Sequence, residues 1–226
     1  MRLVDKSALS QWAADEATRW CVANVDTLLS KSEDGGFQSG RFAWKRTRDL
    51  RAWAGTQIHE TIEAEHTGSW NFPALDDEQQ EIMAQWRALN ERHKIAPILS
   101  EFTVWNPGIA AGTADAILDI DGVRCLVDYK TSKNMWPEHN YQLAALAKSP
   151  IYMQEYELDK WREEPMPAFD KVAIIHLRSD KAEIHYIENI EENYSVFESY
   201  VNVWNAKEKL KAKEKINAIA AYGGFA

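Results

Sequence analysis

The sequence predicts an α/β (α+β) fold with a central mixed β-sheet flanked by helices. Apolar residues recur at helical spacing over roughly the first 95 residues. From about residue 98, apolar and polar residues alternate as they do in half-buried strands. The resulting order is helices, three strands, a helix, two strands and a helix, which is typical of a mixed sheet between helices.

The first part of the chain is expected to consist of three helices. Residues 7–29, 43–66 and 75–93 have helical spacing, and the third is entered through Pro73 and the acidic "DDEQQE". Residues 30–41, "SKSEDGGFQSGR", are expected to form a loop because they are rich in glycine and serine.

The strands follow in two groups. The first contains a strand near 100–106 and a hairpin over 112–131, "GTADAILDIDGVRCLVDYKT", and a helix over "PEHNYQLAALAK" comes next. The second contains "KVAIIHLR" (171–178) and "AEIHYIE" (182–188), joined by "SDK". An amphipathic helix over about 191–221 ends the pattern.

Length and composition indicate one globular domain. The 226 residues contain no stretch that looks like a flexible linker, and 45% are hydrophobic and 27% charged. We expect N-terminal helices over 1–95, a core over 96–190 and a C-terminal helix over 191–226. The sequence contains no apolar run of membrane-spanning length and no signal-peptide pattern at its start, which predicts a cytoplasmic protein.

Charge and cysteine content exclude several functions. The formal charge of -9 argues against a passive nucleic-acid binder but not against an enzyme whose carboxylates hold metal ions. Cys21 and Cys125 are the only cysteines, too few for an iron-sulfur cluster or a zinc ribbon.

The hairpin carries a candidate metal site. With Asp121-Gly122 as a two-residue turn, Asp115 faces Asp128 across the strands and Thr113 faces Lys130. Opposed carboxylates destabilise a sheet unless they share a cation or a proton, or unless the register differs. An Mg²⁺ ion between Asp115 and Asp128, with Lys130 beside it, would remove the repulsion between the two carboxylates. The alternative is a solvated strand edge on which Lys130 pairs with one aspartate.

Four short motifs in this order resemble a nuclease family. They are "GTQIH" (55–59), "GTAD" (112–115), "LVDYKT" (126–131) and the glutamine of "NYQLAALA". The set resembles the PD-(D/E)XK nuclease superfamily, specifically the RecB-type and phage exonuclease branch without an iron-sulfur cluster. The resemblance implies a restriction-endonuclease-like core and a deoxyribonuclease dependent on Mg²⁺ or Mn²⁺, an exonuclease of phage recombination or DNA processing being favoured over an endonuclease.

The resemblance also implies residue roles. Lys130 would be the catalytic lysine, and Gln142 would orient the site from the following helix. The branch often has a tyrosine four residues after that glutamine, whereas this chain has Leu146. The implied metal ligands are His59, Glu101, Asp115, Asp128 and the main-chain carbonyl of Tyr129. By itself, His59 four residues before Glu63 is typical of a surface pair.

Several residues are candidates for contacts with DNA. They are the cations of "KRTRDLR", namely Arg46, Arg48 and Arg51, and Lys133 and Trp136 of "TSKNMWPEH". A solvated helix face is the alternative for the arginines. His66, His93, His139, His176 and His185 lack metal-ligand spacing and are interpreted as structural or exposed, with His139 near the site as a weaker alternative.

The expected partners and the rival function follow from the family. DNA is the expected partner, a single-strand annealing protein is a candidate second partner, a homo-oligomer is an open alternative, and no membrane partner is expected. If the chain is phage-encoded, it would act in the cytoplasm of the bacterial host. The rival is a catalytically silent protein that grips DNA or a protein partner with the same fold.

Overall fold

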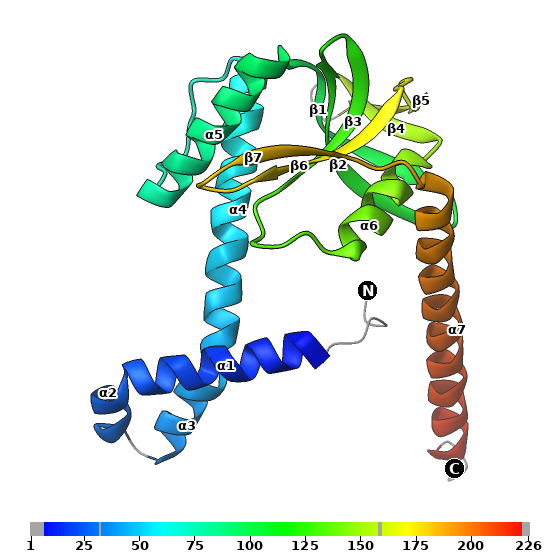
Figure 1. Cartoon of the computed structure of the whole chain (residues 1–226). Coiled ribbons are helices and arrows are strands. Elements are labelled where there is room, and N and C mark those ends of the chain that lie inside the picture. Colours follow the sequence, from blue (N-terminus) through cyan, green and yellow to red (C-terminus); the bar gives the residue numbers. More distant parts are fainter. Residues whose placement is uncertain (1–6, 32, 158–159, 223–226) are drawn as a thin grey trace. The chain divides into compact units, whose positions relative to one another are not determined.

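The computed structural model describes residues 7–31, 33–157 and 160–222. The chain divides into two compact units, one ending at Glu60 and one beginning at Thr61 (Figure 1). The boundary falls inside one helix, α4 (Ala43–Thr67). The two units are described separately, and a single domain over 1–226 stays a prediction.

The unit that ends at Glu60 is helical. It contains α1 (Ser7–Ala23), α2 (Val25–Leu29), α3 (Glu33–Arg41) and the first part of α4. The helix predicted over 7–29 is interrupted at Asn24, whose side-chain amide donates to the Trp20 carbonyl at 2.8 Å. An asparagine that satisfies backbone groups through its own side chain competes with the helix, which accounts for the break.

The prediction of a loop over 30–41 was wrong, because α3 occupies most of it. The glycines of this segment allow helices to approach closely. A Cβ on Gly40 would lie 2.7 Å from the Cys21 Sγ of α1, closer than packed atoms can be. In this segment glycine content indicates close packing between helices. The contacts between helices stabilise α3 in spite of the low helix propensity of glycine.

We expect Gly40→Ala to destabilise the helical unit despite its favourable helix propensity. The new methyl group would overlap Cys21, and overpacking of this kind costs about 1–3 kcal/mol. Gly36→Ala in the same helix is the matched control, because its Cβ would meet Leu28 at an ordinary 3.6 Å. Urea unfolding of both variants checks the difference, and a Gly40→Ala protein as stable as Gly36→Ala would contradict it.

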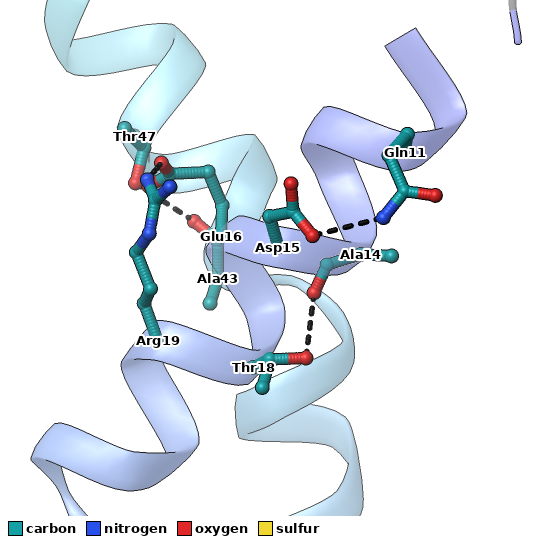
Figure 2. Close-up of polar contacts among 8 residues, drawn as sticks. All are labelled: Gln11, Ala14, Asp15, Glu16, Thr18, Arg19, Ala43 and Thr47. Atoms are coloured by element: carbon teal, nitrogen blue, oxygen red, sulfur yellow. Dashed lines mark hydrogen bonds and ion pairs between the residues drawn. The ribbon is translucent and has the colours of Figure 1, made fainter. Parts of the chain in front are cut away.

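The polar contacts on α1 lie within the helix itself (Figure 2). Gln11 donates to Asp15 at 2.9 Å, and Arg19 pairs with Glu16 at 2.7 Å. Exposed pairs at this spacing add only about 0.3–0.5 kcal/mol each. They support α1 locally and do not indicate a binding site.

The second unit is built on a seven-stranded mixed sheet with the order β5-β4-β1-β2-β3-β6-β7. The strands are β1 (Ala96–Asn106), β2 (Ala110–Ile120), β3 (Val123–Lys130), β4 (Ile151–Glu157), β5 (Lys160–Pro165), β6 (Lys171–Leu177) and β7 (Ala182–Tyr186). The pairing of β3 with β6 is parallel and the other pairs are antiparallel. A mixed sheet flanked by helices is therefore confirmed.

The sequence-based prediction missed the β4–β5 hairpin. Its second strand, "KWREEP", has almost no apolar residues and is largely exposed. It is an edge strand of the sheet, where one neighbour is absent and charged residues are common. Alternation of apolar and polar residues is weakest in an exposed edge strand, so the sequence pattern did not indicate a strand here.

Helices cover both faces of this sheet. Leu143 of α6 (Pro137–Ala147) shares a buried cluster with Leu126 of β3. Three residues along β3, Tyr129 lies edge-on to Trp86 of α5 (Asp77–His93), with ring centroids 5.5 Å apart. Residues at odd spacing on a strand point to opposite faces, so α6 and α5 lie on opposite sides. The last helix, α7 (Ile190–Tyr222), packs on α6 (Figure 1).

The central hairpin confirms the predicted turn. Asp121 and Gly122 have φ angles of 53° and 85°, the left-handed pair that a type I′ turn requires. The cross-strand register from Ile120–Val123 to Ala116–Val127 is the predicted one. This turn and register determine where Asp115, Asp128 and Lys130 lie along the strands.

Candidate metal centre

The regular ladder between β2 and β3 ends one step before Asp115, within the part of the chain that the structure describes. If the ladder continued, the Tyr129 N–H would donate to the main-chain carbonyl of Ala114, because hydrogen-bonded pairs alternate along an antiparallel ladder. It donates instead to the Asp115 carboxylate, Oδ2, at 2.7 Å. Asp115 and Asp128 are therefore not a directly opposed pair in this ladder. The Asp115 side chain instead binds the β3 backbone at Tyr129.

Lys130 and Asp128 form an ion pair at the end of β3. The Lys130 Nζ lies 2.6 Å from the Asp128 Oδ2, and the side chains are 19% and 4% exposed. Residues two apart on a strand point to the same face, so the pair lies on the side covered by α6. A buried carboxylate is tolerated only with a cation or hydrogen-bond donors, and Lys130 supplies the cation.

Glu101 brings a further carboxylate toward Asp115 from the neighbouring strand. One oxygen from each of the two side chains lies within 4.8 Å of the other. The register of β1 against β2 shifts between Pro97 and Leu99, and Glu101 itself has a φ of 45°, a left-handed conformation that costs a non-glycine residue about 1–2 kcal/mol. Local strain of this kind is common where a strand aims a functional side chain.

Burial raises the pKa of two of these carboxyl groups. Partial burial raises the pKa of Glu101 to about 7, and the charges of Asp115, Glu63 and Asp128 add to the effect. Burial also raises the pKa of Asp115, although the Tyr129 N–H and Lys130 act in the opposite direction. Glu101 remains open to solvent. A group of oxygens that repel one another and can be reached from solvent has the chemistry of a divalent-cation site.

We expect Glu101 to make stability fall as pH rises from about 4.5 to 7. In this range folded Glu101 keeps a proton that the unfolded chain, with the ordinary value of 4.5, has lost. The folded state binds more protons, so its free energy of unfolding decreases with pH until the folded pKa is passed. Glu101→Gln should therefore gain stability relative to wild type across this window and keep the gain above pH 7.

Urea unfolding without metal at pH 4.5, 6 and 8 measures this effect. Glu163→Gln, at an exposed position of β5, is the control for introducing an amide on a strand. A difference between wild type and Glu101→Gln that stays constant with pH, or has the opposite sign, would contradict the raised pKa. Added Mg²⁺ at pH 8 should stabilise wild type more than Glu101→Gln.

The other predicted site residues lie on the expected elements. Tyr129 is buried in β3, and Gln142 is an exposed residue of α6. His59 belongs to the unit that ends at Glu60 and lies on α4, four residues before Glu63. The roles of His59, of Gln142 and of the Tyr129 carbonyl stay predictions.

Two of the arginines predicted to contact DNA make contacts within the helical unit. Arg46 lies over the Trp20 ring at 5.0 Å and donates to the Ser39 carbonyl. Arg48 pairs with Asp49 at 2.6 Å. Arg51 is exposed. Contacts of this kind also suit a solvated helix face, so the DNA-contact role of this segment stays a prediction.

Lys133 and Trp136 lie in the connection from β3 to α6. Both are exposed, and Trp136 presents 48% of its surface to solvent. The connection begins directly after Lys130, so these two residues follow the candidate metal centre in the chain. Their role in binding DNA stays a prediction.

Glu63, which lies near the site, was not among the predicted site residues, and His139 was predicted there only as a weaker alternative. Glu63 of α4 contributes to the raised pKa of Glu101, although its spacing from His59 suggested only a surface pair. His139 of α6 has its pKa lowered to about 4, chiefly by burial and next by the charge of Lys130. His139 is thus neutral at pH 7. The sequence signal for both was helical position alone, which does not show what a helix packs against.

Comparisons with known proteins give no family for this chain. No protein-family model matches the sequence, and no curated protein matches it. Among the described residues, no helix has the length and apolar character needed to cross a membrane.

Proposed function

We propose that this protein is a metal-dependent nuclease that hydrolyses phosphodiester bonds in DNA. The observation that carries the proposal is the approach of the Glu101 and Asp115 carboxylates, together with the Asp128–Lys130 ion pair at the end of β3. Burial, and after it the charges of Asp115, Glu63 and Asp128, raises the pKa of Glu101 to about 7. Asp115, Asp128 and Lys130 belong to the motifs by which the sequence resembles the PD-(D/E)XK nucleases, and Glu101 resembles an additional acidic residue of that family. The family itself, and with it the exonuclease branch, is part of the proposal.

The residues present suit Mg²⁺ or Mn²⁺. Both ions prefer carboxylate, carbonyl and water oxygens, and Mg²⁺ is usually held by one or two carboxylates and several waters. Glu101 and Asp115 supply such oxygens close together, and Asp115 is already oriented by the Tyr129 N–H. Asp128 is the third proposed carboxylate ligand. A bound ion would polarise the phosphate and lower the pKa of an attacking water.

The protein's own groups would do the remaining work. Asp128 holds the Lys130 ammonium in place, so Lys130 can orient the attacking water or offset the negative charge that grows on the phosphorus oxygens. The Tyr129 N–H fixes one Asp115 oxygen and leaves the carboxylate in a defined direction. These groups cost little reorganisation during the reaction because they are positioned before substrate binds.

DNA is the proposed partner in spite of the acidic chain. With a formal charge of -9, general attraction to phosphates is weak, so binding would depend on local cations, on the bound metal and on stacking. Lys133 and Trp136 are proposed for this role. We propose action in the cytoplasm, in a bacterial host if the chain is phage-encoded, with a single-strand annealing protein as a candidate second partner.

Cleavage of end-labelled linear DNA and of closed circular DNA tests the proposal. Purified protein should degrade the linear substrate with Mg²⁺ or Mn²⁺, and chelator should stop the reaction. Products released from ends alone indicate an exonuclease, whereas nicked circles indicate an endonuclease. Binding of DNA without cleavage under either metal would favour the catalytically silent alternative, and absence of divalent-metal binding in calorimetry would overturn the proposed metal centre.

A further inference from the structure

A second group of metal-ligating side chains lies on the β6–β7 hairpin. It consists of His176 on β6 and of Glu183 and His185 on β7. One ring nitrogen from each histidine and one Glu183 carboxylate oxygen all lie within 4.8 Å of one another. His176 is the cross-strand partner of Glu183, and His185 is two residues further along β7, so all three project from the same face.

His176 is held in a form that suits metal binding. Its side chain is buried, and its Nε2 lies 2.6 Å from the main-chain carbonyl of Ser132. A carbonyl can only accept, so Nε2 carries a proton and Nδ1 is the ring nitrogen left to bind a metal. Histidines that bind metals usually donate their other N–H in this way to a carbonyl or carboxylate. This hydrogen bond involves a residue outside the group and is independent evidence for the site.

The other two ligands are accessible. The Lys181 Nζ lies 2.7 Å from the Glu183 carboxylate, and the Glu183 side chain is partly exposed. His185 lies 3.8 Å from the same carboxylate oxygen, and its ring centroid is 6.1 Å from that of His176. His185 is exposed, so an ion can enter from solvent.

We propose that His176, Glu183 and His185 bind a zinc ion. Two imidazoles and one carboxylate form a His₂Glu set, which holds Zn²⁺ with a fourth position open to water. The oxygen-only ligands at Glu101, Asp115 and Asp128 suit Mg²⁺ or Mn²⁺ instead, so the two sites differ in the metal they prefer. The zinc site is additional to the proposed nuclease centre and does not depend on it.

Zinc at this hairpin would also order the connection after β3. The ion would fix the His176 ring, and His176 holds the Ser132 carbonyl at the start of that connection. Lys133 follows directly in the chain. The hairpin would thereby help to position the residues that are proposed to contact DNA.

Competition of the full-length protein with a zinc-binding dye tests the site. An Asp115→Asn/Asp128→Asn background removes the other candidate centre and should still bind one equivalent of Zn²⁺. His185→Gln and Glu183→Gln, placed at accessible positions so that folding is preserved, should each weaken zinc binding by at least about tenfold, since even loss of a ligand's hydrogen-bond partner costs about 10–100-fold. Because the readout is zinc binding, its failure is distinguishable from a failure of nuclease activity.

His93→Gln is the matched control. His93 lies on α5, where its ring contacts Asp121 at 2.8 Å, and it should leave zinc affinity unchanged. Absence of a zinc equivalent in the Asp115→Asn/Asp128→Asn protein, or affinity unaffected by both His185→Gln and Glu183→Gln, would overturn the proposal. Hydrogen exchange over residues 131–136 should slow when Zn²⁺ is added, and unchanged exchange would overturn the link to this connection.

Discussion

Asp128→Asn is expected to lower the rate of DNA cleavage by at least about 10³-fold while the protein stays folded. A catalytic metal ion contributes several kcal/mol to transition-state stabilisation, and each 1.36 kcal/mol corresponds to a factor of ten in rate. Asparagine keeps the shape of aspartate but removes one charge from the proposed ligand set. It also removes the ion-pair partner of Lys130, so the metal and the ammonium would both be misplaced.

Asp119→Asn is the matched control for this experiment. Asp119 lies on β2, as Asp115 does, but its carboxylate accepts the Gly122 N–H of the turn at 2.8 Å. Its replacement should cost at most about 1 kcal/mol of stability and leave cleavage unchanged. Rates are to be measured on linear DNA at saturating Mg²⁺, with circular dichroism to verify folding. Wild-type activity in folded Asp128→Asn protein would refute the proposed centre.

The position of the hairpin could be predicted because its determinants are local. Asp121-Gly122 selects one turn type, and the turn fixes the register of both strands. Asp128 and Lys130 lie on β3 as predicted, but the predicted register is shown only as far as Ala116–Val127. It did not predict the behaviour of Asp115, because the exchange of a ladder hydrogen bond for a side-chain bond to Tyr129 depends on the detailed geometry at the end of the ladder.

Features that depend on distant parts of the chain escaped prediction. The raised pKa of Glu101 needs burial of its side chain, a carboxylate from α4 and two from the hairpin, none of which is visible in the residues around Glu101. The closeness of His176 to His185 likewise depends on the register of β6 against β7. Sequence spacing detects ligands on one helix or in one loop more readily than ligands assembled across strands.

The glycines of α3 show the same limit in the fold. Glycine usually marks turns, and "EDGGFQSG" reads as a loop on that rule. In the structure Gly40 lies against Cys21, so the residue is small because another helix passes close by. The pattern of a single sequence cannot tell a glycine in a turn from a glycine at a close contact between helices, because the close contact depends on which helix packs against it.

Lys130→Met is expected to lower the free energy of unfolding by about 3 kcal/mol in metal-free buffer. The substitution keeps most of the aliphatic stem but removes the cation beside Asp128, and breaking a buried ion pair costs about 3–5 kcal/mol because the remaining charge is left uncompensated. The lower end of this range of about 3–5 kcal/mol applies because the Lys130 side chain is 19% exposed and water can reach part of the ion pair. Lys133→Met, on an exposed side chain three residues later, should change stability by less than about 0.5 kcal/mol.

A double-mutant cycle separates the ion pair from other effects of the substitution. Asp128→Asn combined with Lys130→Met removes both charges, so the double variant should be more stable than Lys130→Met alone, with a coupling energy of about 1–3 kcal/mol. Mg²⁺ should restore part of the stability of Lys130→Met, because an ion bound by Asp128 replaces the missing cation, but it should not restore cleavage, because Lys130 is the proposed catalytic group. Additive single effects would show that Asp128 does not depend on Lys130. Full cleavage by Lys130→Met would remove Lys130 from the mechanism while leaving the carboxylates as candidate metal ligands.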